Sequence, residues 1–571
     1  MQQGKKVSIS FGWDCHGLPI ESRAKSIDGD LIDNAKKIAV HYSSLQKKTL
    51  NKFAIYSTEN DFLTMDNSFV EREINLFNEL HKNGHIIKKN KPTWYSPTLK
   101  TVLANSEIEY KTIEDESIYF TMPINNEIRL LVWTTTEWTI SGNQAVCINS
   151  NIEYVKTIDG FICSKKFALD NNLLYDLFDI SSIKTYKNTS GEECPVIFDD
   201  YVKDENTGIV HLCGGHGDDD FRILEENKII SKNVCNKEEL LDHIKNYRLK
   251  DIFVYKREKN KHEYPVDWRE SNKVYKILTE QTYLDFDVDK IKKCLKQINL
   301  SSKDRNRLST TIFSRKDWCI SRQRKWGVNI PNSEDILDVW FDSGSTFTMY
   351  NTPADIYIEG SDQHRGWFQS SIILASMIDK IPTKRIITHG FVIDDTKEKL
   401  SKSKDNAKSL DYYFDKYNPD VLRLWVLMSD FKNDIVFSEE SLDTAGKQYF
   451  RIRNLLRYFI NNLHRESHDE NNVNVETLNL ISNLKTNIKN NIEEFNLQKA
   501  TRILIDFLIK YSSTLTEDIK NNFYESDIDS ELRIKMENEF YFISKSMIDI
   551  IFPFLPFLST ELECSINDIN K

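Results

Sequence analysis

A single stretch, residues 354–374, limits the fold more narrowly than any other part of the sequence. A short apolar run, Ala354–Ile358, leads into a polar turn that contains Gly360, and a helical pattern starts at about Arg365. In open α/β sheets, ligands bind at turns of this kind, at the carboxyl ends of the strands. The stretch therefore predicts an α/β fold with a ligand-binding site at the edge of its sheet.

A second stretch repeats this arrangement farther along the chain. Arg385–Ile393 reads as a strand that is interrupted in its middle by a histidine and a glycine, and the loop KLSKS, Lys399–Ser403, follows it. Ammonium groups such as those of Lys399 and Lys402 stabilise the charge that builds on a phosphate during transfer. A lysine cluster alone is more often a solvated surface, but its pairing with the upstream turn favours a phosphate site.

These two stretches resemble one known family. KLSKS, with Leu400 in place of the usual methionine, resembles the KMSKS signature loop of class I aminoacyl-tRNA synthetases, and Tyr357–Ser371 (YIEGSDQHRGWFQSS) resembles the segment that precedes this loop in isoleucyl-tRNA synthetases. The resemblance implies a catalytic domain with a Rossmann-type parallel sheet. It also implies that this domain activates an amino acid with ATP and Mg²⁺. It assigns catalysis to Lys399 and Lys402, and ATP binding to Gly360, His389, Gly390 and Lys402.

Composition restricts the other functional classes. The chain has 571 residues, which is enough for several domains, and its net charge of −11 argues against a broad basic face for indiscriminate nucleic-acid binding. The nine cysteines form no C-x-x-C pair and Pro331 is followed closely by Asp335, where relatives often carry a metal-binding insertion, so we expect no zinc site. No apolar run is long enough to span a membrane and no signal peptide is evident, which predicts a cytoplasmic protein.

The amino-acid site is expected to begin near the N-terminus. Val7–Trp13 reads as a strand that delivers Asp14 into a turn closed by glycine and proline. From the residues alone, a helix cap or turn role for Asp14 is as probable as an ammonium-binding role. The segment FGWDCHGLPIE resembles one in isoleucyl-tRNA synthetases, and this resemblance gives Asp14 the α-amino group of the amino acid.

Two tryptophans are the expected walls of the side-chain pocket. The resemblance assigns Trp340 and Trp367 to the isoleucine side chain, Gln363 to the α-amino group beside Asp14, and Glu359 to the aminoacyl-adenylate. Aromatic walls recognise a branched aliphatic chain by shape and burial. Packing in a core is the commoner fate of tryptophan in general. The surrounding motifs favour isoleucine over valine and leucine.

One family motif is missing from the sequence. Class I synthetases carry a HIGH signature at the end of an earlier strand, and no HIGH sequence occurs here, since the pair His16-Gly17 belongs to the later motif. We therefore expect a sheet that is incomplete at the N-terminus. Three interpretations stay open: a truncated gene product, one part of a split enzyme whose separate N-terminal polypeptide carries HIGH, or a decayed copy.

Residues 118–265 change from helical to alternating periodicity and predict a β-rich inserted domain. A threonine-rich strand end is ordinarily only a β-sheet surface. Here the pattern resembles the editing domain of isoleucyl-tRNA synthetases, which hydrolyses valyl-tRNA, although Glu137 replaces a proline and Cys213-Gly214 replaces Ala-Pro. The residues that this resemblance assigns to editing are Thr134, Thr135, Thr136, Asn143, His211 and Asp220.

Two further segments complete the prediction. Arg322, Gln323 and Arg324 could contact a tRNA acceptor stem, or could lie on a solvated face. Amphipathic periodicity after the lysine loop predicts an all-helical region that resembles an anticodon-binding bundle. The predicted domains are 1–117 and 266–411 (catalytic), 118–265 (editing) and 412–571 (anticodon binding).

The resemblance thus implies an isoleucine–tRNA ligase whose partners are tRNA(Ile), isoleucine and ATP. The alternative is a catalytically incomplete fragment or paralogue that only binds or edits tRNA.

Overall fold

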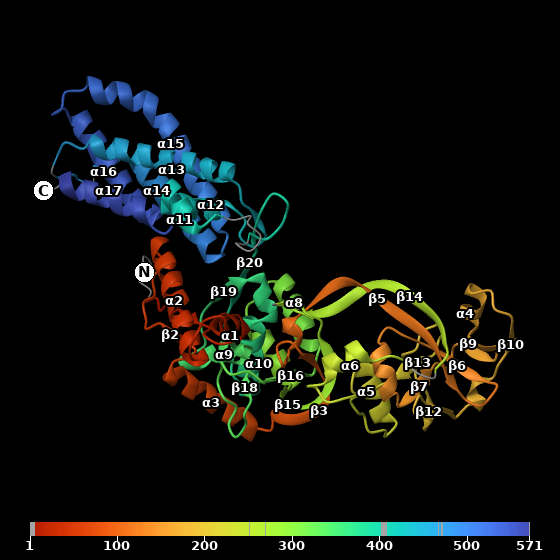
Figure 1. Ribbon diagram of the computed structural model, residues 1–571. Helices are drawn as coiled ribbons and strands as arrows, with labels where there is room; N and C mark the ends of the chain where they lie inside the picture. The colour runs from red at the N-terminus through yellow and green to blue at the C-terminus, as the bar shows by residue number, and fades with distance from the viewer. Residues whose placement is uncertain are drawn as a thin grey trace.

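The computed structural model describes residues 6–249, 252–268, 270–400, 408–465, 467–469 and 472–569. Figure 1 shows a central α/β region, a β-rich region at the far end of a long two-stranded ribbon, and a helical region on the opposite side. The predicted combination of an α/β catalytic fold, an inserted β-rich domain and a C-terminal helical bundle is confirmed.

The N-terminal part of the central region pairs two short parallel strands. β1 (Gly12–Trp13) lies beside β2 (Phe62–Leu63), with Gly12 opposite Phe62. Helix α3 (Asn67–Lys82) packs an apolar stripe against the core, and this stripe includes Phe69, Leu76 and Leu80. The helices of this part are α1 (Leu18–Lys25), α2 (Leu31–Lys52) and α3 (Asn67–Lys82).

The second half of the central region contributes another parallel pair. β19 (Tyr357–Gly360) pairs with β20 (Ile386–His389). Helix α10 (Trp367–Met377) follows β19 and is buried from Phe368 to Met377, as expected for a helix that is apolar on all sides. The other elements here are α7 (Val288–Gln297), α8 (Ser302–Phe313), β17 (Ser321–Arg322), β18 (Ile336–Leu337), α9 (Val339–Ser345), β21 (Val392–Ile393) and β22 (Ile435–Val436).

A four-stranded sheet and a ribbon lead to the inserted domain. The sheet has the order β16 (Asp317–Cys319), β15 (Tyr275–Asp285), β3 (Ile86–Ser96) and β4 (Thr101–Val102). The ribbon consists of β5 (Ile108–Pro123) and β14 (Val254–Asp267), which pair antiparallel from Ile108–Asp267 to Phe120–Val254. In Figure 1 these two strands form the long arch between the central and β-rich regions.

The inserted domain is built on a mixed sheet whose order is β10-β8-β9-β6-β13-β7-β12-β11, with β5 beside β6. Its core includes Phe120, Leu130 and Val132, all fully buried. The strands are β6 (Arg129–Thr134), β7 (Ala145–Ile148), β8 (Tyr154–Thr157), β9 (Phe161–Ser164), β10 (Tyr175–Leu177), β11 (Thr185–Lys187), β12 (Glu193–Phe198) and β13 (Val210–Leu212); the helices are α4 (Lys165–Asp170), α5 (Asp218–Glu226) and α6 (Leu240–Asn246).

The C-terminal region is helical and shares one apolar core, which includes Leu456, Phe540 and Leu558. Arg423 joins it to the central region, because its guanidinium donates to the carbonyl oxygens of Phe53, Pro553 and Phe554 at 2.8, 2.8 and 3.1 Å. The helices are α11 (Leu410–Lys416), α12 (Pro419–Met428), α13 (Glu439–Asn461), α14 (Val475–Glu493), α15 (Leu497–Glu525), α16 (Glu531–Ile551) and α17 (Pro556–Ile569).

Some predicted bounds differ from those observed. The strand expected over Val7–Trp13 is regular only at its last two residues, because the Thr58 and Asp61 side chains take the backbone N–H groups of Ile9 and Phe11. The strand expected over 354–358 lies at 357–360, and the helix expected from 365 starts at 367 after a 3-10 turn. The boundaries at 117/118 and 265/266 fall inside the ribbon strands, and that at 411/412 falls inside α11.

Among the described residues, no helix combines the length and apolar character needed to cross a bilayer.

Candidate active site

The loop after β1 is tied to helix α9 through two carboxylates. Ser343 Oγ donates to Asp14 Oδ2 at 2.5 Å, and His16 Nδ1 lies 2.5 Å from Asp342 Oδ2. The His16 ring also packs edge-on against Trp326 with a centroid separation of 4.9 Å. Because both carboxylate contacts use adjacent residues of α9, they fix the position of the predicted ammonium-binding Asp14 relative to that helix.

The electrostatics of Asp14 suit a cationic ligand. Loss of hydration around its carboxyl, together with the nearby Asp342 and Glu359 carboxylates, raises the pKa of Asp14 to about 7. Asp14 is nevertheless exposed as a residue, so a ligand from solvent can reach it. An ammonium group placed there would offset the repulsion among the carboxylates and favour the ionised form of Asp14.

The two predicted pocket tryptophans lie near one backbone turn, and neither is fully buried. A Cβ atom at Gly366 would lie 2.6 Å from the Trp340 ring, so the indole can occupy this place only because residue 366 is glycine. Trp367 stacks on Tyr357 with a centroid separation of 4.0 Å, and its Nε1 donates to Thr346 Oγ1 at 3.0 Å. The structure therefore brings Trp340 and Trp367 together on either side of Gly366.

Gln363 belongs to the same turn. Its Oε1 accepts from the backbone N–H of Trp367 at 2.9 Å, and a Cβ at Gly366 would lie 2.5 Å from this oxygen. The 3-10 turn Ser361–Arg365 and the start of α10 thus position Gln363 beside the indoles.

The predicted nucleotide-binding residues lie at the ends of β19 and β20. Gly360 is opposite His389 in the parallel register, and Glu359 is exposed immediately before it. A Cβ at Gly390 would lie 2.2 Å from the backbone of Asn433, which explains the glycine at that position. The predicted interruption of the strand at His389-Gly390 is confirmed, because β20 ends at His389 and β21 begins at Val392.

Only part of the lysine loop can be placed. Lys399 is exposed, and its Nζ lies 4.0 Å from the centroid of the Phe391 ring, close enough for a cation–π contact. Lys402 lies outside the described residues, so its predicted role stays a prediction.

A hydrogen-bonded chain of hydroxyls occupies the candidate editing site. Thr136 Oγ1 lies 3.2 Å from Thr134 Oγ1 and 3.0 Å from Thr139 Oγ1, which in turn lies 3.0 Å from His211 Nε2. Thr135 is half-buried beside this chain. The structure thus brings His211 of β13 to the threonine-rich end of β6.

Among the hydrogen-bonded side chains of the candidate editing site, His211 has an unusual environment. Its ring is 5% exposed, and its Nδ1 has no hydrogen-bond partner within the part of the protein that the structure describes. Burial, with a smaller contribution from His216, lowers the pKa of His211 to about 4. The imidazole is therefore neutral near pH 7 and retains an unused ring nitrogen.

Asn143 and Asp220 are more closely bound to the scaffold. Asn143 donates to the carbonyl oxygen of Ala145 at 3.0 Å and accepts from Tyr186. Asp220 Oδ2 accepts from the backbone N–H of Cys213 at 2.8 Å, and burial raises the pKa of Asp220 to about 7. Within the described residues no hydrogen bond links either side chain to the threonines or to His211.

Glu137, which replaces the proline of related domains, makes an ion pair. Its Oε2 lies 2.8 Å from Arg257 Nη1 of β14, and the same guanidinium nitrogen lies 2.7 Å from Glu116 of β5. This ion pair attaches the turn after the threonines to the ribbon.

The burial of Arg322 and of the Arg324 side chain argues against the suggested contact of these two residues with an acceptor stem, whereas Gln323 is half-buried. Arg322 is 1% exposed and contacts Glu107 and Asp338, Gln323 Nε2 donates to Asp335 at 3.1 Å, and the Arg324 side chain is 5% exposed. Three polar residues in sequence resemble a solvated face, but this segment crosses the interior where a strand meets two acidic partners.

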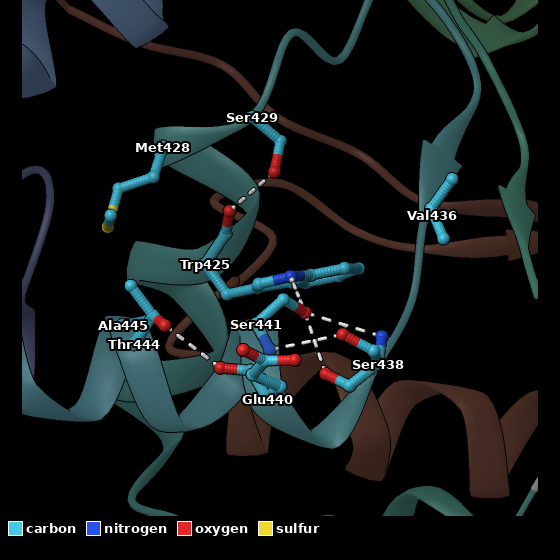
Figure 2. Close-up of a pocket in the computed structure, with 9 residues that line it drawn as sticks. All are labelled: Trp425, Met428, Ser429, Val436, Ser438, Glu440, Ser441, Thr444 and Ala445. Atoms are coloured by element: carbon cyan, nitrogen blue, oxygen red, sulfur yellow. Dashed lines mark hydrogen bonds between the residues drawn. The ribbon is translucent and has the colours of Figure 1, made fainter. Parts of the chain in front are cut away.

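A surface pocket of about 400 Å³ lies in the C-terminal region, and Figure 2 shows the residues that line it. Trp425 Nε1 donates to Ser441 Oγ at 2.8 Å on one of its walls, and Ser438 caps α13. The pocket is lined by Trp425, Met428, Ser429, Val436, Ser438, Glu440, Ser441, Thr444 and Ala445. Because it contains none of the predicted ligand-binding residues, it is not part of the candidate site.

Sequence reasoning missed the residues that hold Asp14 in place. Ser343 and Asp342 lie in the motif that follows Trp340, and nothing in the local pattern showed that they would meet the loop after β1. The buried carboxylate Glu73 of α3 could have been noticed in the sequence, because it interrupts the apolar stripe of that helix.

Comparison with known sequences identifies the family. The tRNA synthetases class I (I, L, M and V) family matches residues 1–333 and 331–438, and the anticodon-binding domain of tRNA ligase matches residues 476–568. The chain belongs to the class I aminoacyl-tRNA synthetases. It is an aminoacyl-tRNA ligase, as the resemblance implied.

Sequence relatives of this synthetase include isoleucine–tRNA ligases from several bacteria. The protein from Sulfurimonas denitrificans is 30% identical, and the alignment covers 98% of this chain and 76% of the relative. Those from Nitratiruptor sp. and Mycoplasma genitalium are 28% and 29% identical, with 98% and 97% of this chain and 75% of each relative covered.

Solved structures share the fold. A methionyl-tRNA synthetase from Mycobacterium tuberculosis bound by methionyl-adenylate matches with a TM-score of 0.59 at 13% identity, covering 98% of this chain and 86% of that one. The Agrobacterium radiobacter LeuRS–tRNA–LeuAMS complex matches with a TM-score of 0.54 at 16% identity, covering 99% and 80%.

Proposed function

We propose that this synthetase activates isoleucine with ATP to form isoleucyl-adenylate and transfers the isoleucyl group to tRNA(Ile). The observation that supports the proposal is the 2.5 Å contact of Ser343 with Asp14, because it holds the Asp14 carboxylate, the proposed partner of the amine, against the helix that carries Trp340. Gln363, in the 3-10 turn before α10, and Trp367, the first residue of α10, lie on either side of Gly366, beside the Trp340 ring. A charged group for the amine and two indoles for an aliphatic side chain together fit a branched amino acid.

The proposed chemistry has two steps and needs no covalent protein nucleophile. The isoleucine carboxylate attacks the α-phosphorus of ATP and pyrophosphate leaves; a ribose hydroxyl of the tRNA then attacks the acyl carbon of the adenylate and AMP leaves. Asp14 and Gln363 hold the amine, and Glu359 lies where the adenylate would extend toward Gly360 and His389. Lys399 and Lys402 would offset charge on the phosphates, so positioning and electrostatics supply the catalysis.

Mg²⁺ would enter this site with ATP. The ion prefers phosphate and water oxygens with one or two carboxylates rather than an all-protein cage. Glu359 is an exposed carboxylate at the strand end that we propose for nucleotide binding, and it fits that mode of binding. The ion would neutralise phosphate charge there.

A second proposed activity is hydrolysis of valyl-tRNA(Ile) in the inserted domain. A pocket for isoleucine gains only about 1–3 kcal/mol from one methylene, and this enzyme type is the standard example of that limit. The supporting observation is the buried Nδ1 of His211, which has no partner among the described residues and lies at the end of the threonine chain, where a ligand hydrogen bond would satisfy it. Thr134, Thr135, Thr136, Asn143 and Asp220 would complete that site.

Isoleucine-dependent exchange of pyrophosphate into ATP tests the activation step. The purified chain is expected to exchange with isoleucine, more weakly with valine and not with leucine, and Asp14→Asn is expected to raise the KM for isoleucine. Exchange that does not depend on isoleucine, or none at all, would contradict the proposal and leave the alternative of a protein that only binds or edits tRNA.

Deacylation of pre-formed valyl-tRNA(Ile) tests the editing step independently. Hydrolysis is expected with the wild-type chain and with Asp14→Asn, but not with His211→Ala. Equal hydrolysis by His211→Ala would exclude the assigned site.

Two predictions lie outside this proposal. A separate N-terminal polypeptide that carries HIGH finds no support in the comparisons. The cytoplasmic location stays a prediction.

A further inference from the structure

Glu73 is an anomaly in the core beneath the candidate site. It lies on the apolar face of α3 with Phe69, Leu76 and Leu80, and it is fully buried. Neither carboxyl oxygen has a hydrogen-bond donor among the described residues. An ionised carboxylate left in this condition would cost more free energy than a folded domain can ordinarily spare.

The groups that face Glu73 explain how it is tolerated. Asp342 of α9 is the neighbouring group within hydrogen-bonding reach, and its own Oδ1 also lacks a partner among the described residues. His16 occupies the other carboxyl oxygen of Asp342, and Asp14 adds a further nearby negative charge. Two carboxyl groups that meet without a donor between them are stable only if they share a proton.

We propose that Glu73 is a positioning residue, which as a neutral carboxylic acid donates its proton to Asp342 and so fixes the loop that carries Asp14 and His16. The inference deepens the proposed function, since that loop is the proposed binding site for the isoleucine ammonium group. A proton on Glu73 would let Asp342 accept two hydrogen bonds, one at Oδ1 from Glu73 and one at Oδ2 from His16 Nδ1. The result is one negative charge at the pair instead of two.

Burial and the two aspartates agree with this arrangement. Burial, followed by repulsion from Asp342 and Asp14, holds the pKa of Glu73 well above its ordinary value. The other titratable groups near the loop include His16, which contacts Asp342, Glu359, which acts on Asp14, and Asp66, which acts on Cys15. Glu73 thus supports the site through Asp342 and does not itself touch the ligand.

Three variants separate the neutral-acid role from simple packing. Glu73→Gln keeps the shape and a donor for Asp342 but cannot ionise, whereas Glu73→Met fills the space without a donor. Glu71→Gln is the control, because Glu71 lies on the exposed face of the same helix. Circular dichroism and thermal melting establish that each variant is folded at the temperature of measurement.

The first readout needs no ligand. At about pH 7 the infrared carbonyl absorption of protonated carboxylic acids is expected to be weaker in Glu73→Gln than in the wild-type chain and Glu71→Gln, while Asp14 and Asp220 contribute to this absorption in all three. Identical spectra for wild type and Glu73→Gln would overturn the proposal, because Glu73 would then be ionised. The NMR signals of the His16 imidazole, assigned with His16→Gln, are expected to shift in Glu73→Met and to stay near wild type in Glu73→Gln.

The second readout is calorimetric binding of L-isoleucine. Glu73→Gln is expected to bind within about twofold of wild type, and Glu73→Met about tenfold more weakly, because Asp342 loses a buried donor. Wild-type affinity in a folded Glu73→Met variant would show a merely structural role and overturn the proposal. If the wild-type chain binds no isoleucine, the proposed function fails, while the infrared band and the His16 signals still decide whether Glu73 positions the loop.

Discussion

The Arg322 guanidinium lies 2.7 Å from Asp338 Oδ2 and 3.0 Å from Glu107 Oε2, in a position that solvent does not reach. Burial opposes ionisation of Glu107, but Arg322 and Arg324 together hold its pKa below the ordinary value. Glu107 directly precedes the ribbon strand β5, and Asp338 is the N-cap of α9, two residues before Trp340. One arginine therefore connects the base of the ribbon to the candidate amino-acid pocket.

Arg322→Met is expected to destabilise the chain by about 3–5 kcal/mol, because it leaves two buried carboxylates without their shared partner. Urea unfolding followed by tryptophan fluorescence measures the loss. Arg451→Met removes an exposed arginine of α13 and is expected to change stability by less than about 0.5 kcal/mol. Equal effects of the two substitutions would show that the ion pairs contribute little.

Trp367→Ala is expected to weaken isoleucine binding by at least about tenfold, because it removes an aromatic wall of the proposed pocket. Trp367→Phe keeps part of that wall and is expected to lose less. Calorimetric titration with isoleucine measures both, and Trp268→Ala, at a more exposed position, serves as the control. Unchanged affinity in Trp367→Ala would place the pocket elsewhere.

The inserted domain is expected to lose stability in acid through His211 and His216. Burial lowers the pKa of each imidazole to about 4, whereas the unfolded chain binds the same protons near pH 6.5. Protons therefore favour the unfolded state between pH 6.5 and 4, and each histidine contributes on the order of 3 kcal/mol of stability that is lost as the pH falls through this window.

His211→Gln is expected to flatten this pH dependence, while His41→Gln, at an exposed position, is expected to leave it unchanged. Urea midpoints measured between pH 4 and pH 7 make the comparison. A slope that His211→Gln does not alter would mean that His211 is already charged in the folded protein.

Arg423→Ala is expected to loosen the C-terminal helical region from the end of α2, since it removes donors to Phe53, Pro553 and Phe554. Hydrogen bonds from charged groups are worth about 1.5–3 kcal/mol each. Differential scanning calorimetry is expected to resolve a separate, earlier transition for the helical region. Arg502→Ala, an exposed substitution in α15, should keep the wild-type thermogram.

Local patterns predicted the elements better than their contacts. The turn at Gly360, the break at His389-Gly390 and the helical C-terminal region are visible in the sequence because each depends on neighbours in the chain. The ionised partners of Arg322 and the neutral acid proposed at Glu73 depend on residues far away in sequence. A charged residue in the sequence therefore indicates that its side chain will need a polar partner. Only the three-dimensional structure shows which residue that partner is.

The sequence indicated the residues of the candidate amino-acid pocket more completely than the hydrogen-bond network of the candidate editing site. Asp14, Trp340 and Trp367 were named from motifs, and the structure gathers them around α9 and Gly366. Thr139, which carries the hydrogen bond to His211, was not singled out, because its spacing is that of an ordinary turn.

The ribbon of β5 and β14 separates the central region of the synthetase from the inserted domain, and a molecule that reaches both regions must cross this separation. Thirteen paired positions at about 3.4 Å each span roughly 45 Å. A free amino acid or adenylate that left one end would be diluted into solvent before it reached the other. Under the proposed function, the single-stranded end of a tRNA, held by the body of the tRNA, would carry the amino acid between the two ends of the ribbon.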